Sequence, residues 1–240
     1  MSIMSWNVRG LGNKETVRAL KNASFKYKLG IIFLSETKKK KRFGKNFIDT
    51  KVSLNGEEDW FLTFIYGPPY TEEKQTFWES LASLRNNNEK KWCLIGDSNV
   101  VARPEEKLGG LTFDASSAKW FHDFTDASCL IELPLKGGTF TWSNQRSEDD
   151  AILEKLDRII VSLEWSSSFP KVIGVLDAAI ASDHAPIFLF LKGMTKKFWK
   201  EAEENQNPTQ TMEQDEEGHG QTKRGGDEGK NTIYARETTQ

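Results

Sequence analysis

Cysteine, histidine and long apolar runs are all scarce in this sequence. It contains two cysteines and three histidines among 240 residues. Cys93 and Cys129 each lie in an apolar run, so we expect two buried thiols in a reducing compartment, and the absence of paired Cys/His spacing excludes a structural zinc site. The longest apolar run, residues 187–191, has the length of a strand rather than the ~20 residues of a membrane span. Without a signal-peptide pattern, the sequence predicts an intracellular protein, nuclear or cytoplasmic, that is not secreted and has no membrane partner.

A strong net charge is also missing. The formal net charge is −2, and residues 194–240 hold seven of the 33 basic and ten of the 35 acidic residues, which leaves residues 1–193 near neutrality. This balance does not by itself identify a nucleic-acid-binding protein, although local patches matter more than totals. The basic run at residues 38–42 is more typical of a solvated loop than of a DNA clamp.

Composition divides the chain into two parts. Residues 194–240 are rich in Glu, Gln, Asn, Thr and Gly, with few apolar side chains to offset the entropy of ordering. We therefore predict one domain over residues 1–193 and a disordered polar tail over residues 194–240.

Segments typical of strands and helices alternate along the predicted domain. Helices are predicted after Asn13, after Thr71 and over residues 115–127. Strands are predicted over residues 2–8, 30–36, 61–66, 92–95, 139–143, 156–161, 172–176 and 186–191. This alternation predicts an α/β fold whose sheets are covered by helices on their outer faces.

Most of the predicted strands end in polar residues. These residues are Asn7, Glu36, Asp97, Asn99, Asp157, Asp183 and His184. Because strand ends in α/β sheets commonly surround one cleft, we expect these side chains to lie together. Crowded carboxylates need a cation, and oxygen ligands without thiolates suit Mg²⁺ or Mn²⁺. The set predicts metal-assisted phosphoester hydrolysis, in which His184 stabilises charge on phosphorus or moves a proton.

Seven short motifs occur in the order typical of one family. They are WNVRG at residues 6–10, LSET at 34–37, YGP at 66–68, GDSN at 96–99, FTWSN at 140–144, LDR at 156–158 and SDH at 182–184. Together they resemble the endonuclease/exonuclease/phosphatase superfamily, and most closely the endonuclease domain of plant LINE-type (non-LTR) retrotransposons. The resemblance implies a DNase I-like fold of four layers, α/β/β/α, in which a two-layer β-sandwich is flanked by helices.

The resemblance also implies a role for each motif residue. The metal ligands would be Glu36, Asn7 and Asp183. The catalytic residues would be Asp97 for the attacking water, Asn99 for that water or a phosphate oxygen, Tyr66 and His184 for the phosphate, and Asp157 to orient His184. The DNA contacts would be Thr141, Asn144 and Arg158. From the residues alone, plainer roles stay open: Asp97 and Asn99 capping a turn, Tyr66 as a turn aromatic, and Asp157 with Arg158 as a surface ion pair.

Three features depart from the family pattern. Arg9 stands where apurinic endonucleases carry an acidic residue, which implies a single-metal site. Ser98 replaces a bulkier residue, and we expect looser packing beneath the GDSN motif. Between Glu36 and Tyr66 the chain is far shorter than in the family. Part of one sheet is therefore expected to be missing, with residues 49–54 able to form a new edge strand.

These observations predict a Mg²⁺-dependent phosphodiesterase of retrotransposon endonuclease type, a monomer that nicks DNA by attack of a metal-assisted water on a backbone phosphate. No reverse transcriptase pattern follows the motifs, which predicts a fragment or a domesticated copy of such an element. The short segment predicts weak or absent nuclease activity. Two alternatives stay open: a non-catalytic relic that binds nucleic acid or a partner, and a phosphatase acting on a small phosphorylated molecule.

Overall fold

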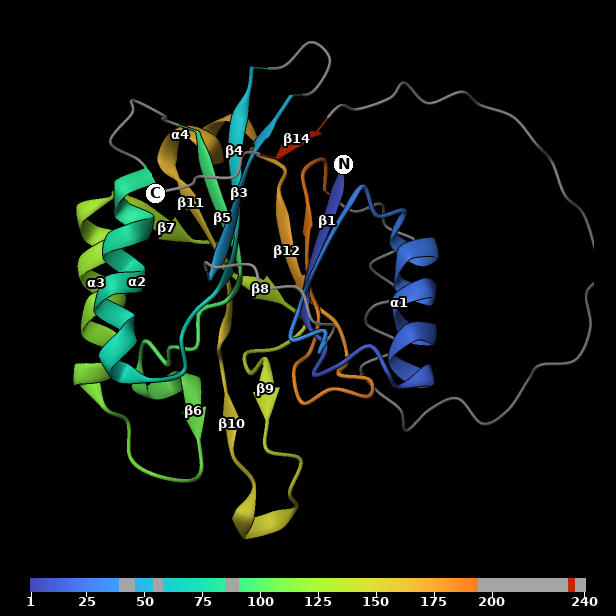
Figure 1. The fold of residues 1–240 in the computed structure, drawn as a ribbon, viewed down its shortest axis with the longest axis vertical. Coiled ribbons are helices and arrows are strands. Elements are labelled where there is room, and N and C mark those ends of the chain that lie inside the picture. The colour runs from blue at the N-terminus through green and yellow to red at the C-terminus, as the bar shows by residue number, and fades with distance from the viewer. Residues whose placement is uncertain (39–45, 54–57, 85–90, 194–232, 236–240) are drawn as a thin grey trace, which may run out of the picture.

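Four layers follow one another across the molecule: helix, sheet, sheet and helices (Figure 1). The computed structural model describes residues 1–38, 46–53, 58–84, 91–193 and 233–235. The predicted α/β sandwich flanked by helices is confirmed.

The first layer of the sandwich is a five-stranded sheet in the order β2-β1-β13-β12-β8. Its strands are β1 (Ser2–Asn7), β2 (Ile31–Ser35), β8 (Leu135–Lys136), β12 (Ile173–Leu176) and β13 (Ile187–Phe190). β1 lies in its interior, parallel to β2 and antiparallel to β13. The sheet therefore delivers the ends of β1 and β2 to the same edge.

The second layer is a six-stranded sheet in the order β14-β3-β4-β5-β11-β7. Its strands are β3 (Phe47–Val52), β4 (Trp60–Tyr66), β5 (Trp92–Asp97), β7 (Leu130–Glu132), β11 (Asp157–Ser162) and β14 (Ile233–Ala235). β4 and β5 run parallel, and β11 is antiparallel to β5, so β11 begins where β4 and β5 end.

Helices cover the outer faces of both sheets. α2 (Thr71–Leu84) and α3 (Ala115–Ala127) lie on the six-stranded sheet, and α1 (Lys14–Tyr27) lies on the other sheet, as Figure 1 shows. Asn13 caps α1 as predicted, because its side chain accepts a hydrogen bond from the Glu15 amide at 2.9 Å. The remaining elements are α4 (Leu163–Ser168) and a small sheet of β6 (Lys107–Leu108), β9 (Trp142–Ser143) and β10 (Leu153–Glu154).

Strand alternation divides the apolar residues among three clusters. Along β5, Cys93 and Ile95 face the other sheet, whereas Trp92 and Leu94 pack with α2 and α3. Both faces of β5 are therefore covered by other elements, which explains why this strand is a continuous apolar run in the sequence. A third cluster joins α1 to the outer face of the five-stranded sheet.

The chain between Glu36 and Tyr66 contributes to both sheets. β2, which precedes it, is an edge strand of the five-stranded sheet, and Ile32 is 40% exposed. A strand does lie beside β4 near the predicted residues 49–54, since β3 pairs antiparallel with β4 along its whole length, but it covers residues 47–52 and β14 occupies its outer edge. Leu54 lies outside the described residues.

Two further expectations need correction. Cys93 is buried, but Cys129 is exposed, because the chain turns there with a positive φ of 49° after α3. Residues 233–235, part of the predicted disordered tail, form β14 on the open edge of β3, where Tyr234 pairs with Lys51. Ile233 and Tyr234 are among the few apolar residues of that segment, and β3 offers them unpaired backbone groups. The rest of the predicted tail lies outside the described residues.

Among the described residues, each helix is too short or too polar to span a membrane.

Candidate active site

Alternation along the strands directs the polar strand ends into the space between the sheets. Asp97 follows Cys93 and Ile95 on the inter-sheet face of β5, and Asp157 has the same parity as Ile159 on β11. The two aspartates pair directly across the β5–β11 ladder. The apolar inter-sheet layer therefore ends in two buried, facing carboxylates.

His184 enters this space from the loop that precedes β13. Its Nδ1 lies 2.9 Å from Asp157 Oδ2, and its Nε2 lies 3.8 Å from Asp97 Oδ2. The backbone is held as well, because the Trp6 indole donates to the His184 carbonyl at 3.0 Å. All three titratable side chains are at most 7% exposed. They form a rigid imidazole flanked by two acids.

Burial and mutual charge shift the pKa values of this group. Burial alone lowers the pKa of His184, but the charge and hydrogen bond of Asp157 outweigh it and raise that pKa to about 9. Burial, followed by the charge of Asp157, raises the pKa of Asp97 to about 7. These shifts favour the protonated form of the imidazole near neutral pH, and they make Asp97 a stronger base than an ordinary aspartate.

Asn7, at the end of β1, connects this group to a third carboxylate. Its Nδ2 lies 3.0 Å from Glu36 Oε1 and 3.1 Å from Asp97 Oδ2, and 3.4 Å from His184 Nε2. Asn7 is 1% exposed and pairs with Ser35 of β2, so its amide is fixed by the sheet. Four of the sequence-predicted site residues thus meet at one amide group.

Glu36 stands on the open side of the site. Tyr66, from the end of β4, donates its hydroxyl to Glu36 Oε1 at 2.9 Å, and burial together with the Glu36 charge raises the pKa of the phenol. Both bonds to Glu36 use Oε1, and within the described part of the chain Oε2 has no hydrogen-bond partner. Glu36 is exposed and adopts a positive φ of 50°, which turns its side chain toward the cleft mouth.

Asp183 is neutralised by groups of the chain itself. Its Oδ2 accepts from the Arg9 guanidinium and from the Trp142 indole, both at 2.8 Å, whereas Oδ1 is buried without a partner. Arg9 therefore supplies a fixed positive charge at this position of the site.

The donor set is suited to a hard divalent cation. Ligand atoms of Asp97, Asp157 and His184 all lie within 4.8 Å of one another, a spacing that could hold a metal ion. The imidazole, however, is bonded to Asp157 and carries a proton, and a metal-bound histidine must be neutral. Oε2 of Glu36 is a more suitable anchor, because it is exposed and unbonded.

Asn99 completes the site from the loop after β5. Its backbone amide donates to Asp97 Oδ1 at 2.9 Å, and its side-chain amide donates to the Gly67 carbonyl at 2.7 Å. The expected loosening at Ser98 is wrong. Ser98 is fully buried, and both its amide (2.8 Å) and its hydroxyl (2.6 Å) donate to the Leu156 carbonyl, which ties this loop to β11.

Thr141 and Asn144 have structural bonds in this conformation. The Thr141 hydroxyl accepts from the amides of Leu156 and Asp157, both at 2.9 Å, and Thr141 is 1% exposed. Asn144 is partly exposed and organises its own hairpin, since Nδ2 donates to the Asp150 carbonyl and Oδ1 accepts from the Ile152 amide. Contact with DNA stays a prediction for both residues.

Arg158 does not face the cleft, and its predicted role in contacting DNA needs correction. One residue after Asp157 on β11, it points to the opposite face of the sheet and is 0% exposed. Its guanidinium bonds to Glu106, Glu132 and the Val100 carbonyl, and lies 5.1 Å from the Phe121 ring. The alternative of a surface ion pair with Asp157 is wrong for the same reason.

Sequence reasoning missed three residues that hold the site together. The Trp142 indole, within the FTWSN motif, donates to Asp183. Trp6 donates to the His184 carbonyl, and Lys74 of α2 donates to the Asn99 carbonyl at 2.8 Å. For Lys74 a signal existed in the sequence, because a lysine three residues before Phe77 lies on the apolar stripe of its helix.

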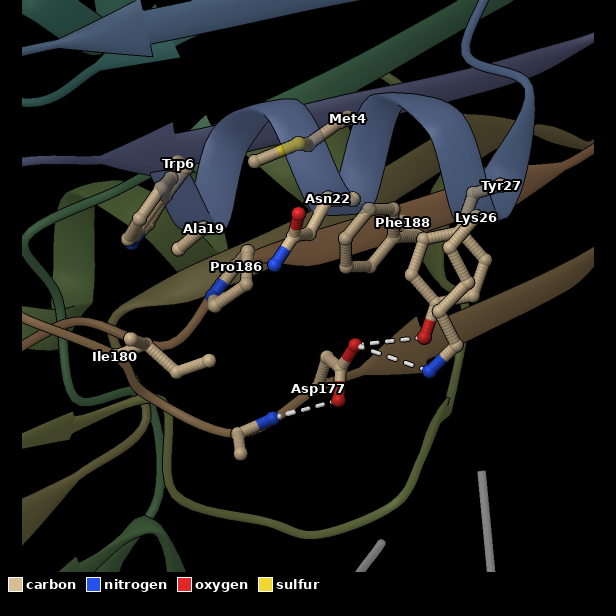
Figure 2. Close-up of a pocket in the computed structure, with 12 residues that line it drawn as sticks. Met4, Trp6, Ala19, Asn22, Lys26, Tyr27, Asp177, Ile180, Pro186 and Phe188 are labelled. Carbon is tan, nitrogen blue, oxygen red and sulfur yellow. Dashed lines mark hydrogen bonds and ion pairs between the residues drawn. The ribbon is translucent and has the colours of Figure 1, made fainter. Parts of the chain in front are cut away.

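A separate hollow lies behind the site, between α1 and the outer face of the five-stranded sheet (Figure 2). It has a volume of about 340 Å³, an apolar lining that includes Trp6, Pro186 and Phe188, and a polar end where Tyr27 donates to Asp177 at 2.6 Å. None of the predicted catalytic or metal residues lines it.

No protein-family model and no curated protein matches this sequence. Solved structures do match. The endonuclease domain of TRAS1, a telomere-specific non-LTR retrotransposon, has a TM-score of 0.60 at 13% identity and covers 81% of this chain and 99% of that domain. The 3′-5′ exonuclease NExo from Neisseria meningitidis has a TM-score of 0.58 at 14% identity, with 79% and 99% covered. The catalytic domain of Xenopus laevis APE2 has a TM-score of 0.57 at 16% identity, with 82% and 94% covered.

These likenesses establish the fold that the motifs predicted, a DNase I-like α/β sandwich. At such low identity they say nothing more about this chain, whose chemistry rests on its own site.

Proposed function

We propose that this protein is a Mg²⁺-dependent phosphodiesterase that nicks DNA. One observation carries the proposal: His184, held by Asp157 at 2.9 Å, lies 3.8 Å from Asp97, and the Asn7 amide donates to both Asp97 and Glu36. A fixed cation beside a base that titrates near neutrality is the arrangement that hydrolysis of a phosphodiester requires. The fold neighbours, an endonuclease and an exonuclease among them, support the same class of reaction.

Each residue of the chain would act at a definite point. Asp97 would accept the proton of the attacking water, because its pKa is raised to about 7. The His184 imidazolium would stabilise the negative charge that grows on the phosphate oxygens, and Asp157 would keep it protonated and oriented. Tyr66 would turn its hydroxyl from Glu36 to a phosphate oxygen when the substrate binds, since its raised pKa keeps it protonated.

Glu36 would hold the metal ion through Oε2, with Asn7 beside it. When bound, the ion supplies positive charge that polarises the phosphate. Arg9 already neutralises Asp183, and a second ion is therefore not needed at that position. We infer a single-metal site.

The test is nicking of supercoiled plasmid by the full-length protein, with Mg²⁺, with Mn²⁺ and with EDTA. We expect relaxed circles with either metal and none with EDTA or with Asp97→Asn. A protein that binds DNA without nicking it would be the non-catalytic relic. Release of phosphate from a small phosphomonoester, without nicking, would identify the phosphatase instead.

A further inference from the structure

Two consecutive carbonyl groups beside the site each accept a hydrogen bond from a buried cation. The Asn99 carbonyl accepts from Lys74 Nζ at 2.8 Å, and the Val100 carbonyl accepts from Arg158 Nη2 at 2.9 Å. Lys74 comes from α2 and is 4% exposed, and Arg158 comes from β11 and is 0% exposed. The loop that carries Asn99 is thus hydrogen-bonded to two different elements, α2 and β11.

The backbone at this point needs such support. Asn99 has a positive φ of 50°, a conformation that costs energy for a residue with a side chain and that persists only where its surroundings over-determine it. Charge-assisted hydrogen bonds are stronger than neutral ones, so two of them on adjacent carbonyls resist rotation of the peptide units between them. The amide of Asn99, in turn, donates to Asp97 Oδ1 at 2.9 Å.

Packing alone does not account for a lysine at this position. Lys74 lies on the apolar stripe of α2 with Phe77, Trp78 and Leu81, which are all buried. An apolar side chain of similar length there would avoid the cost of desolvating an ammonium group. The charge has several partners in the structure: Lys74 donates to the Asn99 carbonyl, and the carboxylates of Asp114, Glu154 and Asp97 attract its ammonium group.

We propose that Lys74 and Arg158 are positioning residues that hold Asp97 and Asn99 in their reactive orientation. This inference rests on the proposed function, because it assigns the two cations to the same hydrolytic site. Neither cation touches the phosphate. Each acts through the backbone of the loop after β5, and misplacement of a catalytic group by 1 Å can cost about 10²-fold in rate.

The activity test uses variants of Lys74. Arg158→Met is unsuitable, because it would also leave Glu106 and Glu132 without their Arg158 ion pairs and endanger folding. For Lys74→Met we expect kcat of plasmid nicking to fall about 10- to 100-fold, with KM for DNA changed by less than about twofold. Lys74→Arg, which keeps a donor, should recover a substantial part of that loss. The control is Leu81→Ala, which removes buried volume about two turns from Lys74 on the same helix and leaves the Lys74 bond in place, and should lower Tm while keeping kcat.

A second measurement does not depend on activity. Hydrogen exchange of the peptide that covers residues 97–102 should speed up in Lys74→Met and stay near wild type in Leu81→Ala under conditions where both are folded. If the wild type does not nick DNA, the proposed function fails, and the exchange result still tests the grip on the loop. Wild-type kcat in Lys74→Met, or unchanged exchange at residues 97–102, would overturn the positioning role.

Discussion

The two halves of the site are built differently. The central half consists of Asp97, Asp157 and His184, which are all buried and supported by the interior strands β5 and β11. The edge half consists of Arg9 and Glu36, which follow β1 and β2; the Arg9 side chain is 57% exposed, Glu36 is exposed, and β2 is an edge strand.

This difference separates two tasks. Groups that stabilise developing charge work best when they are fixed before the reaction, which the central half achieves by burial and short hydrogen bonds. A metal ligand must exchange water and accept an ion, which suits an exposed carboxylate with one unbonded oxygen. In the proposed reaction, the central half would set the intrinsic rate and the edge half would set the metal requirement.

The largest effect should come from the central half. His184→Ala removes the imidazolium and should lower the nicking rate by about 10²- to 10⁴-fold at saturating Mg²⁺. Asp157→Asn should cost less, since it acts through His184. Plasmid nicking at matched concentrations of folded protein measures both. Equal rates for His184→Ala and wild type would remove His184 from the reaction.

The edge half should respond to metal concentration. Glu36→Gln keeps the shape of the side chain and loses the charge, so we expect about a 10²-fold lower rate at 1 mM Mg²⁺ that partly recovers as Mg²⁺ is raised. A Mg²⁺ titration of the nicking rate, with exposed Glu15→Gln as the matched control, measures the change. A rate loss that no Mg²⁺ concentration relieves would argue against a role as metal ligand.

The protonation of His184 tests the central half without any metal. NMR titration of the imidazole in the metal-free protein should give a pKa of about 9, and Asp157→Asn should lower it by at least about one unit. The pKa of His184 in the folded protein lies above the ordinary histidine value of 6.5. The stabilisation that its charge gives to the fold is therefore fully present below pH 6.5 and is lost as the pH rises through about 9. Wild-type protein should therefore lose stability across that range more steeply than Asp157→Asn. A wild-type pKa near 6.5 would contradict the arrangement.

The sequence predicted which strand-end residues meet better than it predicted which groups support them, for physical reasons. Buried strands such as β5 and β11 are recognisable in the sequence as apolar runs. The alternation of their side chains places Asp97 and Asp157 between the sheets. The same alternation predicts that Arg158, one residue after Asp157, points to the opposite face of β11, away from the site. The bonds to Lys74 depend on how α2 packs against the loop after β5, which no local pattern specifies.

Filling the shortened edge should give a moderate effect. Inserting a longer, family-length segment after Lys38 is expected to offer β2 a neighbour and to cover Ile32, which is 40% exposed. Burying a side chain of this size adds about 1 kcal/mol or more, which corresponds to several degrees in Tm. The nicking rate should rise as well, if the edge position of β2 limits the placement of Glu36. An insertion variant that folds with unchanged Tm and rate would show that the short segment costs nothing.

The smallest effect should come from deleting residues 194–240. The described contacts of that segment are those of β14, whose residues 233–235 pair with Val52, Lys51 and Thr50 of β3. Three residue pairs at a solvent-exposed sheet edge contribute little, because water replaces the lost hydrogen bonds, so we expect about 1 kcal/mol or less in the free energy of unfolding. Tyr234→Pro in the full chain is the matched variant, since proline removes a donor and cannot continue the ladder. Chemical denaturation should give the same small loss for both. The deletion could instead lower the free energy of unfolding by more than about 3 kcal/mol while Tyr234→Pro stays near wild type. That result would mean that other residues of the segment pack on the domain.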